Sequence, residues 1–338
     1  MPDFRLLRLP LVALKECLKI MNPLELLNLS MCSRRVSKLI KLGGTSSLEV
    51  SYMFLGSDTK QIEIGTSRSI HRFEFPASHT IPILIRQRTA DFLVAVSQKP
   101  EKASFGWNGS SLELVDYILD TFNCPIHSIS SGSIYPYSSL VELTNWVLTR
   151  QSTIREMSVT TRNLDGEGFK EILDKLTVTE HLDVLSKLNP DFQYTFKKFP
   201  RSISFDSPYW INLEQLLASD CESITLSNSF FTNTDLDAYF EKWKNGDYPN
   251  LKSLRIVSDR LDDLMSIAGV APPVREENNP EEIIRDIYVF SANFIRYRIH
   301  GGVRIKNTKG ITGIIKMGME RDGMQVTFLV VDLFDLVG

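Results

Sequence analysis

The side chains that could catalyse a reaction or bind a metal are few and widely spaced in this sequence. The five histidines are His71, His79, His127, His181 and His300, and none belongs to an HExxH zinc motif. Neither a glycine-rich phosphate-binding motif nor a GxSxG nucleophile motif occurs. We therefore predict a protein that is not an enzyme and holds no metal or cofactor. An enzyme with an unfamiliar site is an alternative, which clustered titratable groups with strongly shifted pKa values in a deep pocket would support.

Adjacent carboxylates occur at Asp262 and Asp263, which follow Leu261 in a segment that we expect to be helical. Neighbouring positions on a helix point in different directions, so the two side chains are poorly placed to share acid–base chemistry. We predict that both face solvent.

Composition and charge exclude several classes of partner. The chain has 338 residues, a net charge of -3 and a pI of about 6.0, so nucleic acid is not expected as a partner. The sequence contains no run of about 18 apolar residues, so no membrane span is predicted. The four cysteines are scattered and form no CxxC pair, which favours a reducing compartment. We therefore expect an intracellular protein, located in the cytoplasm, the nucleus or both.

The N-terminal segment 9–41 predicts three short helices. Pro10 suits the first turn of a helix, Asn22 and Pro23 form an N-cap followed by proline, and two glycines at 43–44 end the third helix. A unit of about 35 residues cannot enclose a hydrophobic core. Its leucine-rich surface must therefore be covered, either by the rest of this chain or by a separate protein.

Residues 7–41 resemble an F-box. The resemblance rests on the opening Leu9 and Pro10, a leucine-rich amphipathic helix, a Pro-Leu-Glu-Leu helix start at 23–26, and a basic third helix. Many F-boxes carry a tryptophan in that third helix, which this chain lacks. The resemblance implies a Skp-type adaptor protein as partner, which in turn links to a cullin scaffold. The residues implied in the adaptor contact are Leu9, Pro10, Leu14, Leu18, Pro23, Leu26, Leu27, Leu29 and Val36.

The segment 45–124 is harder to assign, and we expect it to belong to the repeat-like domain that follows. Alternating apolar residues predict strands at 47–54 and 70–75. Helical spacing predicts a helix at 111–122. The stretch 99–111 is expected to be a loop.

From 125 to 260, helix-like segments and short alternating strands follow one another. Strands are expected at 126–130, 154–160, 201–205, 223–226 and 251–257. Helices are expected at 138–148, 167–176, 213–218 and 234–243. The interval between strand starts is roughly 21 to 47 residues, which indicates stacked strand–helix units similar to leucine-rich repeats. A mobile loop is expected at 271–282, and further strands at 294–305, 312–317 and 325–331.

Residues 222–256 resemble the F-box-associated domain, type 2, of the nematode F-box family. The shared features are Leu226, an acidic helix start at 232–236, Trp243, Gly246, and a Pro-x-Leu-x-x-Leu motif at 249–254. With the C-terminal strands, the resemblance covers about residues 125–335.

The predicted fold class is α+β or α/β. A small three-helix F-box at 1–44 precedes an unassigned α/β segment at 45–124. A leucine-rich-repeat-like F-box-associated domain with a C-terminal β segment follows at 125–338.

The two resemblances imply a substrate-recognition adaptor of a Skp–cullin–F-box ubiquitin ligase, which directs a protein target to degradation. Aromatic side chains at expected loop–helix junctions are candidates for target contact, because they supply a large contact area at low entropy cost. These candidates are Tyr135, Tyr137, Tyr209 and Trp210. The alternative is a non-catalytic repeat scaffold for protein–protein interaction, in which the N-terminal helices only cap the repeats.

Overall fold

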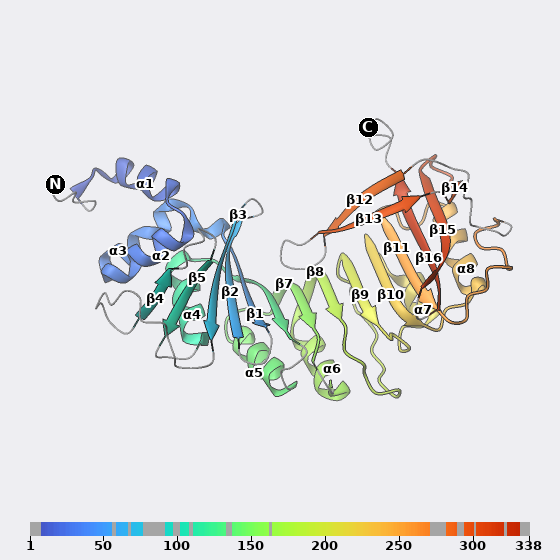
Figure 1. Cartoon of the computed structure of the whole chain (residues 1–338), viewed down its shortest axis with the longest axis horizontal. Helices are drawn as coiled ribbons and strands as arrows, with labels where there is room; N and C mark the ends of the chain where they lie inside the picture. Colours follow the sequence, from blue (N-terminus) through green and yellow to red (C-terminus); the bar gives the residue numbers. More distant parts are fainter. Residues whose placement is uncertain are drawn as a thin grey trace. The chain divides into compact units, whose positions relative to one another are not determined.

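The chain forms two compact units (Figure 1). The structure is a computed structural model that describes residues 8–55, 59–66, 69–76, 92–96, 102–107, 111–132, 137–161, 164–270, 282–288, 294–300, 302–320 and 323–331. Unit 1 is Met1–Tyr135 with Thr149–Gln151, and unit 2 is Pro136–Leu148 with Ser152–Gly338. Residues 45–124 are thus grouped with the N-terminal helices. The domain boundaries at 44 and 124 stay a prediction.

Unit 1 begins with three helices, as the sequence predicts. They are α1 (Leu11–Ile20), α2 (Pro23–Cys32) and α3 (Arg34–Ile40). Two short 3-10 helices follow, η2 (Lys41–Gly43) and η3 (Thr45–Ser47). Gly44 joins them with a φ of 79°, a left-handed conformation that glycine adopts without a steric penalty.

The rest of unit 1 is a sheet with one helix. The strands are β1 (Glu49–Leu55), β2 (Thr59–Thr66), β3 (Ser69–Pro76), β4 (Phe92–Val96), β5 (Lys102–Trp107) and β6 (Ile126–Ser131), in the order β6-β1-β2-β3-β5-β4. Helix α4 (Ser111–Phe122) matches the expected helix at 111–122. The expected loop at 99–111 is wrong over β5. Its sequence KASFGW has little strand character of its own, but pairing with β3 and β4 holds it extended.

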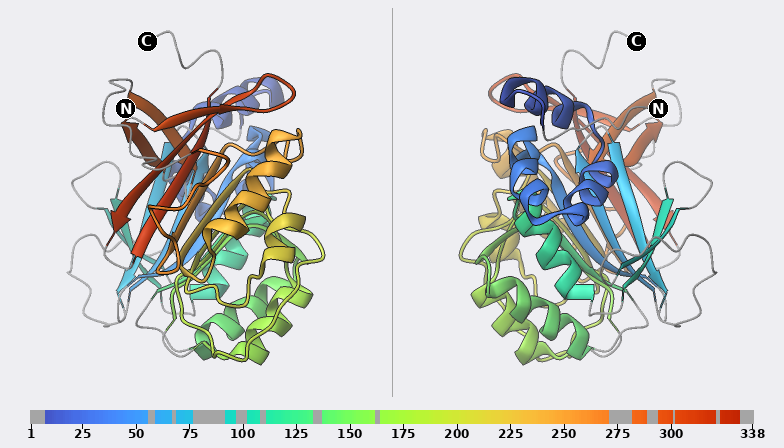
Figure 2. Two further views of the ribbon diagram at one scale, coloured as in Figure 1. Left: turned by 90° about the vertical axis from the view of Figure 1, so that its right-hand side faces the viewer. Right: turned by 90° about the vertical axis from the view of Figure 1, so that its left-hand side faces the viewer.

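Unit 2 is built from parallel strands that follow one another in chain order. They are β7 (Thr153–Val159), β8 (Thr177–Val184), β9 (Ser202–Asp206), β10 (Ser223–Ser229) and β11 (Ser253–Ser258). The helices are α5 (Tyr137–Leu148), α6 (Gly166–Lys175), α7 (Leu213–Ala218) and α8 (Asn233–Lys244). All four lie on one face of these strands (Figure 2). The leucine-rich-repeat character of this arrangement stays a prediction.

Antiparallel strands complete unit 2. Strands β14 (Val303–Lys306), β15 (Thr312–Glu320) and β16 (Gly323–Val331) extend the sheet beside β11, and β12 (Glu282–Tyr288) pairs with β13 (Phe294–His300). The strands expected at 312–317 and 325–331 are found. The single strand expected at 294–305 is instead two strands, β13 and β14, which belong to different sheets. Of the expected loop at 271–282, only Glu282 lies within the described residues, where it begins β12.

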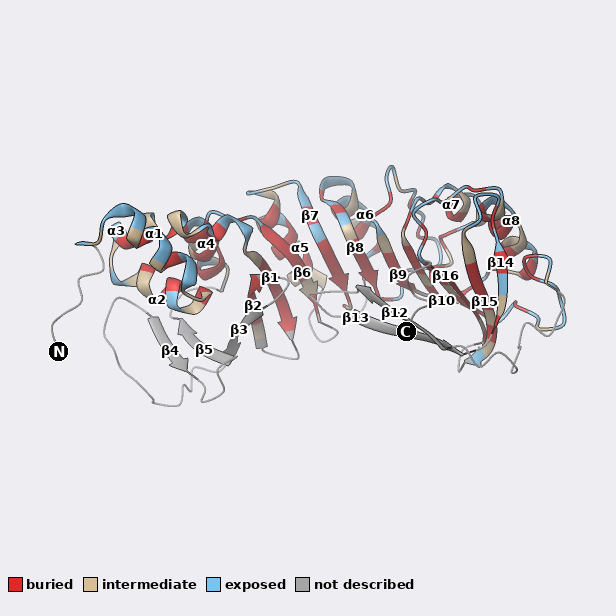
Figure 3. Cartoon of the chain, turned by 90° about the horizontal axis from the view of Figure 1, so that it is seen from above, coloured by how far each residue is buried: buried red, intermediate tan, exposed pale blue. Residues whose placement is uncertain are grey.

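The apolar side chains of unit 2 are packed between its sheet and its helices. Many residues of the strands are buried, and they are red in Figure 3. Trp243 of α8 and Phe328 of β16 meet with ring centroids 4.9 Å apart, and Phe240 approaches the same Phe328 ring at 5.1 Å. Gly313 of β15 lies under this cluster, because a Cβ atom there would collide with the Phe328 ring. The edge-on aromatic contacts thus require a glycine on the facing strand.

Elsewhere in unit 2, one strand was not predicted and one predicted helix does not form. Strand β8 was not expected, although Val178, Leu182 and Val184 place apolar side chains at even positions along it. The helix expected around Leu261 does not form, because Asn233 fixes a turn there. The Asp262 amide donates to the Asn233 side-chain oxygen at 2.8 Å, and the Asn233 amide group donates to the Asp262 carbonyl at 2.8 Å.

Candidate functional sites

The ends of the N-terminal helices are fixed by their own sequence. In the capping box of α2, the Glu25 amide donates to Asn22 Oδ1 at 2.9 Å and the Asn22 amide donates to Glu25 Oε2 at 2.8 Å. In α3, the Val36 amide donates to Ser33 Oγ at 3.3 Å. These local hydrogen bonds fix the starts of α2 and α3 and so divide this segment into short helices.

Most of the residues predicted for the adaptor contact lie inside unit 1. Pro10 is exposed, while Leu9 and Leu29 are half-buried. The buried members of the predicted set are Leu14, Leu18, Pro23, Leu26, Leu27 and Val36. The structure therefore gives these buried side chains a role in holding the helices together. Their role in adaptor contact stays a prediction.

Helix α4 covers part of the surface that the three helices leave open. Both α2 and α3 contact α4. The hydroxyls of Ser30 and Tyr117 are 2.9 Å apart, and Thr45 donates to the Phe122 carbonyl at 2.7 Å. The N-terminal helices are thus joined to the following segment by apolar packing and by hydrogen bonds.

The exposed apolar surface lies on α1 instead. Leu11 is 63% exposed, Val12 76% and Ile20 86%. Val12, Glu16 and Ile20 are spaced four residues apart and therefore share one face of the helix. On that face Lys19 and Glu16 form an ion pair of 2.9 Å. None of these three apolar residues is among those predicted for the adaptor contact, although Leu11 and Val12 directly follow Pro10 in the sequence.

The three aromatic residues predicted for target contact that the structure describes are partly or fully buried. Trp210 is 3% exposed, and Tyr209 is half-buried and donates its hydroxyl to the Leu188 carbonyl. Tyr137 is half-buried in α5, where burial and the nearby Asp165 and Glu171 raise its pKa to about 12. Tyr135 lies outside the described residues. Their role in target contact stays a prediction.

The connection between β8 and β9, residues 185–201, differs from the other crossovers of unit 2. Helices α6, α7 and α8 connect β7 to β8, β9 to β10 and β10 to β11, but this connection contains no helix. Its aromatic residues alternate instead. Phe192 and Tyr194 are buried and Phe196 is half-buried, while the residues between them are exposed. Phe192 and Phe196 pack against Trp210, with centroids 5.2 and 5.9 Å away.

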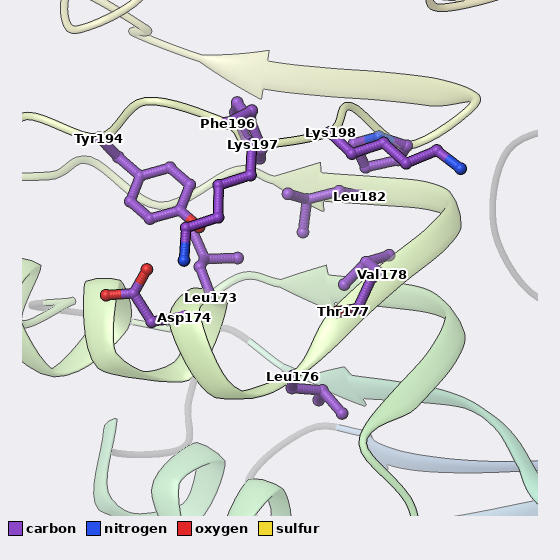
Figure 4. Close-up of a pocket in the computed structure, with 11 residues that line it drawn as sticks. Leu173, Asp174, Leu176, Thr177, Val178, Leu182, Tyr194, Phe196, Lys197 and Lys198 are labelled. Atoms are coloured by element: carbon purple, nitrogen blue, oxygen red, sulfur yellow. The ribbon is translucent and has the colours of Figure 1, made fainter.

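A pocket lies between the C-terminal end of α6, the start of β8 and this connection (Figure 4). Its volume is about 110 Å³. The apolar lining residues are Leu173, Leu176, Val178, Leu182, Phe196 and Pro200. The polar lining residues are Asp174, Thr177, Tyr194, Lys197 and Lys198. Tyr194 hydrogen-bonds to Asp174, and burial followed by the Asp174 charge raises the pKa of Tyr194.

Strand β8 also carries two buried titratable groups. His181 is 2% exposed, neither of its ring nitrogens has a hydrogen-bond partner, and burial lowers its pKa from 6.5 to about 4. Burial raises the pKa of Asp183, against the opposing effect of hydrogen bonds from Ser204 and Ser158. Within the described part of the chain, no group of three or more His, Cys, Asp or Glu is placed to hold a metal ion. No helix in that part is long and apolar enough to cross a membrane.

Family comparisons match two segments of the chain. Residues 6–42 match the F-box domain, and residues 191–256 match a domain described as F-box associated. The first match spans α1 to α3, and the second runs from the β8–β9 connection into β11. The chain therefore carries one segment similar to the F-box domain and one similar to an F-box associated domain, in agreement with the resemblances seen in the sequence. Proteins with these domains are typically non-catalytic adaptors, and F-box domains generally bind a Skp adaptor.

The curated relatives are nematode proteins. The chain is 25% identical over 172 residues to the Skn-1 dependent zygotic transcript 15 protein of Caenorhabditis elegans, covering 49% of this chain and 50% of that protein. It is 23% identical over 280 residues to an uncharacterized protein of the same organism, covering 75% of this chain and 62% of that protein. The chain thus spans about half to three-fifths of the length of these relatives. No solved structure matches it.

Proposed function

We propose that this chain is the substrate-recognition adaptor of a Skp–cullin–F-box ubiquitin ligase. In this proposal α1 to α3 bind a Skp-type adaptor, which links to the cullin, and unit 2 binds a protein target for degradation. The protein then acts in the cytoplasm or nucleus, and no side chain of the chain takes part in bond-making. The observation that carries the proposal is the match of the F-box domain to three helices whose first member exposes apolar side chains.

The exposed side chains of α1 supply the starting contact for the adaptor. Leu11, Val12 and Ile20 are each more than 60% exposed, so most of their apolar area is still available for burial against a partner. Leu9 and Pro10 lie next to this surface in the chain. The buried leucines of α1 hold this helix against the rest of unit 1.

Co-purification tests this proposal. The tagged full-length chain is co-expressed with a Skp-type adaptor, and the adaptor recovered with it is quantified. We expect Leu11→Glu with Val12→Glu to lower recovery about tenfold, because charges at an apolar interface must be desolvated. The matched control is Leu185→Glu with Leu264→Glu, which makes the same change at two exposed residues of unit 2. Equal recovery with both variants would contradict the proposal.

A second candidate function, the scaffold alternative, is a protein-interaction scaffold without a ligase link. It is favoured by the contacts of α2 and η3 with α4, made by Ser30 with Tyr117 and by Thr45 with Phe122, since a capping element would pack in this way. In the scaffold alternative neither the wild-type chain nor any variant recovers the adaptor. Deleting residues 1–44 does not separate the two functions, because it uncovers α4 in both cases.

A further inference from the structure

We propose that the pocket beside the β8–β9 connection binds an acidic segment of a protein target, with one apolar side chain of that segment inserted between α6 and β8. The inference rests on the proposed target-recruiting function and adds the chemistry of the target. The pocket exists because the β8–β9 connection contains no helix. The extended connection at 185–201 covers less of the sheet than a helix would, and the opening lies at its edge.

The size and lining of the pocket match a single apolar side chain. Leu176 is 1% exposed, Leu182 1% and Val178 7%, so the inner wall is part of the packed core and is already in place. A volume of about 110 Å³ is somewhat smaller than the engineered apolar cavity of about 150 Å³ that holds benzene. The inner space of the pocket is therefore of a size for one apolar side chain such as leucine, methionine or phenylalanine.

The charges at the pocket favour an acidic neighbour to that side chain. Lys197 and Lys198 are exposed and make no ion pair with any residue in the described ranges. In Figure 4 the Lys197 side chain lies beside Tyr194, while Lys198 extends outward. Both ammonium groups are thus open to carboxylates of a bound segment.

The one carboxylate of the pocket sets the direction in which an acidic segment lies. Asp174 is hydrogen-bonded by Tyr194, and it occupies the α6 side of the pocket. Like charges repel, so the acidic residues of the segment are directed away from α6 and toward Lys198. An apolar residue followed by two acidic residues satisfies both conditions.

Fluorescence anisotropy with defined peptides tests the proposal on the full-length chain. The probes are fluorescein-labelled Gly-Ser-X-Glu-Asp-Gly-Ser peptides in which X is Leu, Phe or Ser, and Gly-Ser-Leu-Lys-Arg-Gly-Ser. We expect the Leu and Phe acidic probes to bind at least about tenfold more tightly than the Ser probe and the basic probe. The proposal is overturned by absence of binding, by equal binding of all probes, or by preference for the basic probe.

Two variants locate the binding. Thr177→Phe places a ring at the exposed rim of the pocket, and Lys197→Glu with Lys198→Glu reverses its positive charge. Both are expected to weaken the Leu probe about tenfold. The matched controls are Thr179→Phe, two residues further along β8, and Lys170→Glu with Lys187→Glu, which changes the net charge equally outside the pocket. Thermal unfolding of each variant checks that it folds. If controls and pocket variants bind alike, the pocket is not the site.

Adaptor recovery measured with the wild-type chain separates this inference from the function on which it rests. Probe binding without adaptor recovery refutes the ligase link and leaves the pocket as an acidic-peptide site. Adaptor recovery without probe binding refutes the pocket and leaves the ligase link.

Discussion

Acid should weaken unit 2 through His181, and the size of the effect follows from its pKa. The side chain is 2% exposed and both ring nitrogens lack partners, so the folded protein holds the imidazole neutral and its pKa falls from 6.5 to about 4. At a pH between these two pKa values, the unfolded chain binds a proton at His181 that the folded chain does not bind. The free energy of unfolding must therefore fall as the pH is lowered through this window.

The magnitude follows from the two pKa values. A histidine with a pKa of 6.5 when unfolded and about 4 when folded lowers the free energy of unfolding by about 2 kcal/mol at pH 5 and about 3 kcal/mol at pH 4, relative to pH 7. Almost full burial means that solvent screening removes little of this effect. Asp183 acts in the opposite direction: its raised pKa makes the folded chain hold its proton more tightly than the unfolded chain at low pH.

The variant His181→Leu isolates the histidine from the carboxylates. Leucine has a similar volume and leaves no ring nitrogen unpartnered, so no hydrogen bond is lost in the exchange. Urea unfolding followed by tryptophan fluorescence is measured for both proteins at pH 7, 5.5 and 4.5. The wild type should lose about 2 kcal/mol more than the variant between pH 7 and 4.5, because the other titrating groups cancel in the difference. Parallel pH profiles would refute the assignment of His181 as a buried neutral imidazole.

Two further pairs of variants test the packing. Leu27→Ala removes a side chain of α2 that is 0% exposed and should lower the free energy of unfolding by about 2–5 kcal/mol. Val12→Ala on the exposed face of α1 should change it by less than about 0.5 kcal/mol. Similar urea midpoints for the two variants would be inconsistent with the burial pattern. Gly313→Ala places a Cβ against the Phe328 ring and should lower the free energy of unfolding by about 1–3 kcal/mol. Gly318→Ala in the same strand has open space around its Cβ and should be nearly neutral. Calorimetry compares the two variants, and equal melting temperatures would contradict the close approach of β15 to Phe328.

Local sequence chemistry accounts for the elements that were predicted well. Asn22, Glu25 and Ser33 cap their helices through residues three positions away, so the signal is complete within each short segment. The same holds for α8, where Thr232 and Asp235 form a capping box. Such elements are found from sequence because nothing distant is needed to form them.

Distant contacts account for what the sequence did not reveal. The turn at Asp262 depends on the Asn233 side chain, which lies far from it in the sequence. Whether Leu26 and Leu27 of α2 face a partner or the interior depends on what packs against this helix, and α4, which contacts α2, is about 85 residues away in the chain. Sequence periodicity identifies an apolar face of a helix, but it does not identify what covers that face.

The pocket illustrates the same dependence at a candidate site. The family-matched segment 191–256 supplies Tyr194, Phe196 and the two lysines, while α6 and the start of β8, which precede that segment, supply the opposite wall. Two proteins could therefore share the F-box associated segment and still bind different targets, because the apolar wall and Asp174 lie outside it. An exchange of residues 173–182 between such proteins should alter the apolar residue that is preferred, while the lysines should retain the preference for acidic neighbours.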